Sequence, residues 1–206
     1  MRVSTTCTTA SLLLLAGAGA SPTRHATVLT TDQLLAISPN SSSCANAPAP
    51  GECATAAEAA PVINEVFAEY MISTAGEQAA LLSLMAFETG DFKYNRNHFP
   101  GVPGQGTRNM QSPAFNRQYA LSIAEIKDQV SAEDDVSATL DLLLGDARWD
   151  FGSAAWFLTT QCSDAVRQGL RQGDEAGWEA YISQCVGATV TDERTAYWRR
   201  ATNTLF

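Results

Sequence analysis

The sequence contains few histidines, few basic residues and no long apolar run. Only two of the 206 residues are histidine, which disfavours a His-based zinc site and a Ser-His-Asp triad. Lys and Arg total 13 against 22 Asp and Glu, whereas proteins that hold nucleic acid usually carry a basic excess. No segment reaches the ~20 consecutive apolar residues of a membrane-spanning helix. We therefore expect no metal, no organic cofactor, no nucleic-acid partner and no membrane insertion.

The first twenty residues are typical of a secretory signal peptide. A basic residue follows Met1, Leu12–Leu15 form an apolar stretch, and Ala18–Ala20 match the small residues before a signal-peptidase cleavage site. We predict that residues 1–20 are removed and that the mature protein is secreted and extracellular. Residues 21–56 are rich in Ser, Thr, Ala, Pro and Asn without sustained periodicity, which predicts a linker or propeptide.

Two features of the sequence are typical of the secretory route. Asn40 begins an Asn-Ser-Ser glycosylation acceptor sequence. Removal of the signal peptide also leaves four cysteines, an even number that predicts two disulfides in an oxidising compartment. The pairs Cys44–Cys53 and Cys162–Cys185 need no long excursion of the chain, although two other connectivities exist for four cysteines.

Residues 57–206 are predicted to form a single all-α domain. Ile63, Val66, Phe67 and Tyr70 follow the i, i+3, i+4, i+7 spacing of a buried helical stripe. No convincing alternating strand pattern is present. Further helices are predicted from Thr74 and at residues 132–144, 149–160, 164–171, 175–186 and 192–202.

Glu88 interrupts the apolar stripe of the helix that begins near Thr74. The stripe runs through Leu81, Leu84 and Met85, and its next step falls on Glu88. Burial and the negative end of the helix dipole both disfavour a charged carboxylate, and a protonated carboxyl can act as a general acid. The alternative is that Glu88 ends its helix in solvent or caps a neighbouring helix.

A long segment after Glu88 is free of acidic residues although the chain carries a net charge of −9. Residues 92–124 contain four basic residues together with many aromatic and amide side chains. Aromatic rings and amides commonly line carbohydrate grooves, so the segment predicts a substrate-binding loop. The alternative is a long polar loop without a binding role. The basic residues are Lys93, Arg96, Arg108 and Arg117.

The run Phe87–Phe92, a glycine-rich loop and then Arg108–Gln111 resemble the lysozyme-like superfamily, in particular goose-type lysozymes and soluble lytic transglycosylases. In those families a catalytic Glu ends a helix, is followed by Ser or Thr, and precedes a Gly-Leu-Met-Gln motif, of which the Gly-Leu half is not matched here. The resemblance implies a lysozyme-like fold with Glu88 as general acid. The residues expected to bind substrate are Thr89, Tyr94, Arg108, Met110, Gln111 and Tyr119.

A second carboxylate would decide the mechanism of glycoside cleavage. Retaining glycosidases place two carboxyl groups about 5 to 5.5 Å apart, and inverting enzymes about 6.5 to 9.5 Å apart. Asp91 is the nearest acidic residue on the loop side of Glu88. Asp91 is therefore the candidate second catalytic group, with a surface carboxylate as the alternative and with Glu88 acting alone as a further one.

The sequence thus predicts a secreted, monomeric glycoside hydrolase or lytic transglycosylase that acts on an amino-sugar polymer such as cell-wall peptidoglycan, or on chitosan or chitin. A second hypothesis is a secreted helical binding or effector protein without catalysis. A third is a ribonuclease that uses Glu88, His98 and an arginine. Glu88 opposite Gln111 in a cleft favours the enzyme, whereas Glu88 paired with an arginine in a closed core favours the binding protein.

Overall fold

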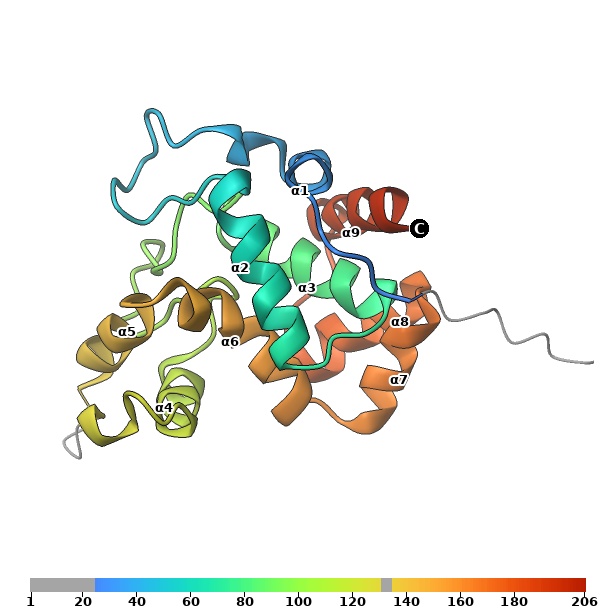
Figure 1. The fold of residues 1–206 in the computed structure, drawn as a ribbon. Helices are drawn as coiled ribbons and strands as arrows, with labels where there is room; N and C mark the ends of the chain where they lie inside the picture. The colour runs from blue at the N-terminus through green and yellow to red at the C-terminus, as the bar shows by residue number, and fades with distance from the viewer. Residues whose placement is uncertain (1–24, 131–134) are drawn as a thin grey trace, which may run out of the picture.

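Nine α-helices and no β-strand make up the part of the chain that the computed structural model describes, residues 25–130 and 135–206 (Figure 1). The all-α prediction is confirmed, and the predicted signal peptide lies outside the described residues. None of the described helices is long and apolar enough to cross a membrane. The helices are α1 (Thr31–Ile37), α2 (Ala56–Glu69), α3 (Ala75–Glu88), α4 (Pro113–Ser122), α5 (Val136–Leu144), α6 (Ala147–Thr160), α7 (Asp164–Gln172), α8 (Glu175–Ala180) and α9 (Asp192–Leu205).

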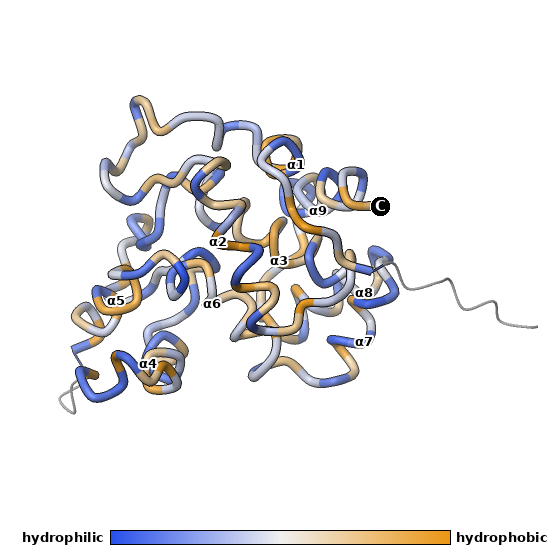
Figure 2. The backbone as a smooth tube through the Cα atoms, in the orientation of Figure 1, coloured by the Kyte–Doolittle hydropathy of each residue, from blue (hydrophilic) through white to orange (hydrophobic). Residues whose placement is uncertain are grey.

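Helix α3 forms the centre of the fold. Every residue from 75 to 86 is buried, and α3 packs against α9, α7, α6 and α1. Figure 1 shows the other helices arranged around it, and Figure 2 shows apolar residues of α2 and α3 toward the middle of the molecule. Because α3 is buried on all sides along most of its length, its last residue, Glu88, is held in place by the core.

The first turn of α3 is tied to α7 by an ionic cluster. Thr74 caps the helix by accepting a hydrogen bond from the Glu77 amide at 3.2 Å. The Glu77 carboxylate is fully buried and lies 2.7 Å from Nε of Arg167 and 3.2 Å from Nε of Arg171. Since a buried carboxylate requires counter-ions, this cluster fixes the position of α7 against α3.

Gly76 allows α3 and α7 to approach closely, and its replacement by alanine is expected to lower the free energy of unfolding by about 1–3 kcal/mol. An added Cβ would lie 2.0 Å from the carbonyl oxygen of Leu170, a backbone atom that cannot rotate away. Urea denaturation measures the effect. Gly169→Ala on α7 is the control, because its Cβ would meet its nearest neighbour at 3.4 Å, an ordinary contact. Equal urea midpoints for wild type and Gly76→Ala would contradict this packing.

Residues 21–56 were predicted to be a linker or propeptide; the linker alternative is wrong for residues 31–37, and removal of a propeptide stays a prediction. Helix α1 lies in this region, its residues Leu34 and Ile37 are fully buried in the core, and α1 packs against α9 and α2. Arg200 of α9 donates a hydrogen bond from Nε to the Ile37 carbonyl at 2.8 Å. The folded domain therefore begins well before residue 57.

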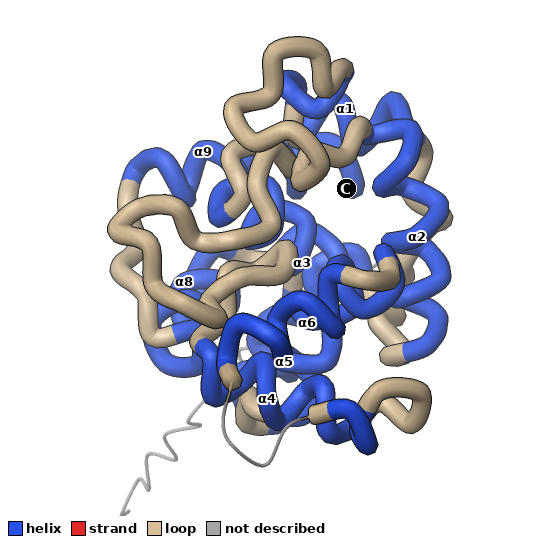
Figure 3. Tube along the Cα trace, turned by 90° about the vertical axis from the view of Figure 1, so that its left-hand side faces the viewer, coloured by secondary structure: helices blue, strands red, loops and turns tan. Residues whose placement is uncertain are grey.

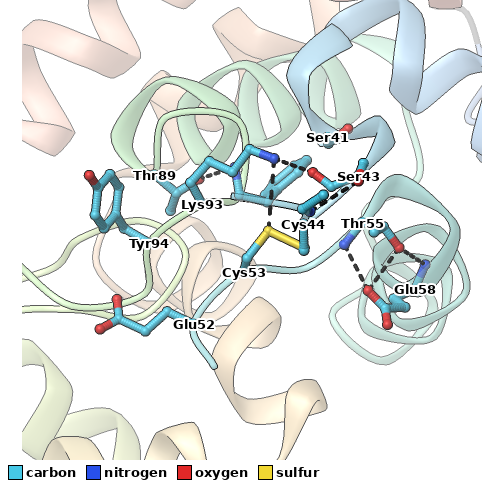
Figure 4. Close-up of a disulfide and its surroundings, with 12 residues drawn as sticks. Ser41, Ser43, Cys44, Glu52, Cys53, Thr55, Glu58, Thr89, Lys93 and Tyr94 are labelled. Carbon is cyan, nitrogen blue, oxygen red and sulfur yellow. Dashed lines mark hydrogen bonds between the residues drawn. A yellow bond between two sulfur atoms is a disulfide. The ribbon is translucent and has the colours of Figure 1, made fainter. Parts of the chain in front are cut away.

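Both predicted disulfides are present. Cys44–Cys53 joins two points of the segment that links α1 to α2, and Nζ of Lys93 lies 3.9 Å from Sγ of Cys53 (Figure 4). Cys162–Cys185 joins the end of α6 to a π-helical turn, η3 (Tyr181–Val186), that follows α8. The second disulfide therefore anchors η3, and residues 187–191 then connect η3 to α9.

Candidate functional site

Glu88 forms an ion pair with Arg194 at the start of α9. Oε1 of Glu88 lies 2.7 Å from Nη1 of Arg194, and the two side chains are 19% and 14% exposed. The Arg194 guanidinium stacks over the Phe87 ring at 4.2 Å, and the Phe87 ring meets the edge of Tyr197 at 5.9 Å. Helix periodicity predicts Glu88 on an apolar helix face without a counter-ion, whereas Arg194, more than 100 residues later in the chain, supplies one.

A cleft of about 320 Å³ opens beside this ion pair and is called here the main cleft. It lies between α3, α4, α6, the segment after η3 and the start of α9. Helices α3, α4 and α6 and residues 186–188 contribute most of the apolar side chains of the lining, called here the apolar wall, and the loop between α3 and α4 contributes its amides, called here the polar wall. The cleft therefore suits a ligand with an apolar part and a polar part. Besides Glu88 and Arg194, it is lined by Leu84, Phe115, Phe157, Val186, Ala188, Gln105, Asn109, Met110, Gln111 and Ser112.

A second cavity of about 290 Å³, called here the side pocket, adjoins the main cleft. The two share Glu88, Gln105 and Met110, so these residues mark the junction between them. The side pocket is formed by the long loop between α3 and α4, which Figure 3 shows among the loops gathered on one side of the helices. Its other lining residues are Gly90, Tyr94, Arg96, Asn97, His98 and Phe99.

Amide side chains form a connected network on the polar wall of the main cleft. Nδ2 of Asn109 donates to Oε1 of Gln111 at 3.2 Å, and Nε2 of Gln111 donates to Oδ1 of Asn116 at 2.8 Å. Nδ2 of Asn116 in turn donates to the Gly104 carbonyl at 2.8 Å. Because each amide is fixed by the next, the polar wall is organised before any ligand arrives.

Arg108 does not line either cavity, contrary to the prediction that it binds substrate. It is buried, and its Nε lies 2.8 Å from Oδ2 of Asp150 on α6. Its two terminal nitrogens donate to the carbonyl groups of Phe92, Tyr94 and Glu52. Burial raises the pKa of the Asp150 carboxyl, and the positive charge of Arg108 opposes that rise. Arg108 therefore holds the long loop on the helical core.

Three more predicted site residues are part of the core rather than of the cleft. Asp91 is 2% exposed and accepts hydrogen bonds from Oγ of Ser38 at 2.7 Å and Nδ2 of Asn40 at 2.6 Å. Thr89 is fully buried and donates from Oγ1 to the Met85 carbonyl. Tyr119 packs against Trp156 beneath α4. Asp91 is therefore neither a second carboxylate of the cleft nor a surface acid.

Asn40, the predicted glycosylation site, is one of the two residues that donate a hydrogen bond to Asp91. The Asn40 residue is solvent-exposed, and only its amide nitrogen points inward to the Asp91 carboxylate. An asparagine with a glycan on Nδ2 keeps one N–H hydrogen, so the contact and the modification are compatible. Glycosylation of Asn40 stays a prediction.

The acid-free segment does not present a free positive surface. Arg96 pairs with Asp141 of α5 at 2.5 Å, and Arg108 pairs with Asp150. Nζ of Lys93 donates to the Ser43 carbonyl, and Nε2 of His98 lies 2.8 Å from Oε1 of Glu52. Other parts of the chain supply acidic partners for Arg96, Arg108 and His98 and a backbone carbonyl for Lys93, which local composition could not show.

Of the predicted site residues, Glu88, Tyr94, Met110 and Gln111 do line the two cavities. The sequence analysis missed Arg194 and the apolar wall. Tyr181 is fully buried and lines neither cavity; burial and the nearby charge of Glu88 raise its pKa. Within residues 25–130 and 135–206, no group of three or more His, Cys, Asp or Glu side chains is placed to hold a metal ion.

The chain is similar to a protein of Fusarium oxysporum (strain Fo5176) named bifunctional dioxygenase (DOX)-epoxy alcohol synthase (EAS). The two are 44% identical over 151 residues, which cover 70% of this chain and 12% of that protein. The chain thus spans 12% of the length of its relative. No family model and no solved structure matches the chain.

This similarity corrects the predicted function. The prediction of a hydrolase or lytic transglycosylase that cleaves peptidoglycan or another polysaccharide is wrong, because the relative is named as an oxygenating enzyme and not as a glycosidase. The prediction depended on short motifs, and the structure gives several of those residues other partners: Thr89 bonds the core backbone, and Asp91 lies outside the cleft. The resemblance to the lysozyme-like superfamily itself stays a prediction.

Proposed function

We propose that this chain is a binding module whose main cleft holds a small amphipathic molecule, with an apolar body and oxygen-bearing polar groups. The observation that carries the proposal is that apolar side chains and amide side chains line one cleft and come from different segments of the chain. Leu84, Phe157 and Val186 belong to the apolar wall, and the amides around Gln111 form the polar wall. The volume, about 320 Å³, is at the lower end of the range for small-molecule sites.

The apolar wall supplies the affinity and the polar wall supplies the orientation of the ligand. Burial of apolar surface contributes about 25 cal/mol per Å², so contacts with the apolar wall favour any compact hydrocarbon body. The amide network fixes where hydroxyl or ether oxygens form hydrogen bonds, because its donors and acceptors are already held by their neighbours. A ligand that matches only one wall would leave the other unsatisfied.

The named relative supports the same ligand class. An epoxy alcohol carries an epoxide oxygen and a hydroxyl, and we propose that the cleft of this chain binds a compound of this kind. The oxygenating activities belong to the name of a protein of which this chain spans 12%. The proposal therefore concerns ligand binding by the module. We also propose that the protein is secreted, which its two disulfides support.

Ala188→Phe is expected to weaken binding of an epoxy alcohol with an octyl chain at least about tenfold, because the added ring would occupy the apolar side of the main cleft. Isothermal titration calorimetry measures the affinity, and circular dichroism confirms that the variant is folded. Ala68→Phe is the control, since Ala68 is an exposed residue of α2 outside the cleft. Equal affinity of the two variants would place the ligand elsewhere and contradict the proposal.

A further inference from the structure

The Glu88–Arg194 ion pair leaves hydrogen-bonding atoms unused on both partners. It joins Oε1 of Glu88 to Nη1 of Arg194, and both side chains line the main cleft and are partly exposed. Within the described part of the chain, no hydrogen bond engages Oε2 of Glu88 or the guanidinium nitrogens of Arg194, and Nη1 is buried without a hydrogen-bond partner although it lies 2.7 Å from Oε1. The pair therefore offers one acceptor and further N–H donors side by side at the cleft.

The position of these groups is fixed by the surrounding rings. Cζ of the Arg194 guanidinium lies over the Phe87 ring, and the Phe87 and Tyr197 rings pack nearly perpendicular to each other. Glu88 ends a helix whose residues 75–86 are all buried. A planar guanidinium stacked on a ring loses little freedom when it binds an oxygen, so the donor and the acceptor are preorganised.

The charges around the cleft favour an uncharged ligand. Glu88 and Arg194 neutralise each other, so the pair gives no net attraction for either a carboxylate or an ammonium group that would lose its hydration in the cleft. The other charged groups of the side pocket, Arg96 and His98, are already paired with Asp141 and Glu52. A neutral ligand that covers the ion pair must nevertheless satisfy its unused donors and acceptor, or their desolvation would cost binding energy.

The pair lies where the polar end of an amphipathic ligand would come to rest. Glu88 belongs to the junction between the main cleft and the side pocket, together with Gln105 and Met110. Glu88 and Arg194 line the same cleft as Leu84 and Phe157 of the apolar wall. An apolar body on that wall therefore places its oxygen-bearing end beside Glu88 and Arg194.

From this geometry we infer that the ligand carries a hydroxyl group next to a second oxygen atom. The hydroxyl donates its hydrogen to Oε2 of Glu88, and the adjacent oxygen accepts a hydrogen bond from Arg194. The inference rests on the proposed function and adds the arrangement of the polar groups, which an epoxy alcohol satisfies with its hydroxyl and its epoxide. Glu88 and Arg194 thus select a ligand by the arrangement of its oxygen atoms and not by the size of its apolar body.

Three ligands with the same octyl chain test this inference by isothermal titration calorimetry: the epoxy alcohol, the allylic alcohol without the epoxide, and the epoxide without the hydroxyl. Wild type is expected to bind the epoxy alcohol about tenfold more tightly than either analogue, because each analogue lacks one hydrogen bond to a charged group. Arg194→Met should lose the preference for the epoxide and keep the preference for the hydroxyl. Glu88→Gln should weaken the preference for the hydroxyl.

Glu175→Gln and Arg199→Met are the matched controls, because these residues form an exposed ion pair at 3.1 Å outside the main cleft. Both should keep the wild-type order of affinities. Arg194→Lys, which keeps the charge but not the planar fork, replaces Arg194→Met if that variant is unstable. Equal affinity of wild type for all three ligands overturns the inference and leaves the proposed function intact, whereas binding of none of them overturns the proposed function.

Discussion

Replacement of Asp150 by asparagine is expected to lower the free energy of unfolding by about 3–5 kcal/mol. The substitution leaves the buried guanidinium of Arg108 without its counter-ion at 2.8 Å. Because Arg108 also holds the carbonyl groups of Phe92 and Tyr94, the loop that lines the side pocket should loosen at the same time. Urea denaturation measures the stability, and the affinity for the epoxy alcohol reports on the loop.

Asp141→Asn is the matched control for this prediction. Asp141 also pairs with an arginine of the acid-free segment, Arg96, but both side chains are largely exposed to solvent. Exposed ion pairs contribute about 0–1 kcal/mol, so the control should unfold close to the wild-type urea concentration. If the two variants lost the same stability, burial of the Arg108–Asp150 pair would not be the cause.

Removal of the second disulfide by the double substitution Cys162→Ala and Cys185→Ala should lower the free energy of unfolding by about 3 kcal/mol, as expected from the loop that it closes. The two cysteines are 23 residues apart. The same variant should also bind the ligand less tightly, because Val186, next to Cys185, lines the main cleft. Thermal unfolding and calorimetric titration measure the two effects.

The variant without the Cys44–Cys53 disulfide separates stability from binding. Its cysteines are 9 residues apart, so the expected loss of stability is similar but somewhat smaller. Neither cysteine lines the main cleft, and the affinity should therefore remain at the wild-type value while the protein is folded. Equal loss of affinity in both double variants would show that the second disulfide has no specific effect on the cleft.

Most helix positions, and the presence of Glu88 in the site, could be predicted because they follow from local periodicity. The stripe Leu81, Leu84 and Met85 leads to Glu88, which the structure places at the cleft. The same spacing holds on α9, where Tyr197 and Trp198 extend back to Arg194. Glu88 is an acidic residue in the apolar stripe of α3, and Arg194 is a basic residue in the apolar stripe of α9. These two opposite charges on otherwise apolar helix faces are the signal that predicts the ion pair.

Contacts between distant segments could not be read from the sequence. The partners of Arg108 and Asp91 come from α6 and from the segment after α1, and no local pattern connects them. Helix α1 was missed because its seven residues lie in a region of linker-like composition, yet burial of Leu34 and Ile37 against α9 stabilises it. Helix α4 lies inside the acid-free segment, whose glycine and proline content indicates a loop.

Glu88 belongs to a helix that is buried along most of its length, while part of the lining of the side pocket, His98 and Phe99, comes from an exposed stretch of loop. Substitutions in α3 would disturb the packing of four other helices, whereas His98 to Pro103 are all exposed. Evolution can therefore change the shape and polarity of the side pocket, residue by residue, while Glu88 keeps its place. Proteins that share this core could differ in the compounds they bind without any change of fold.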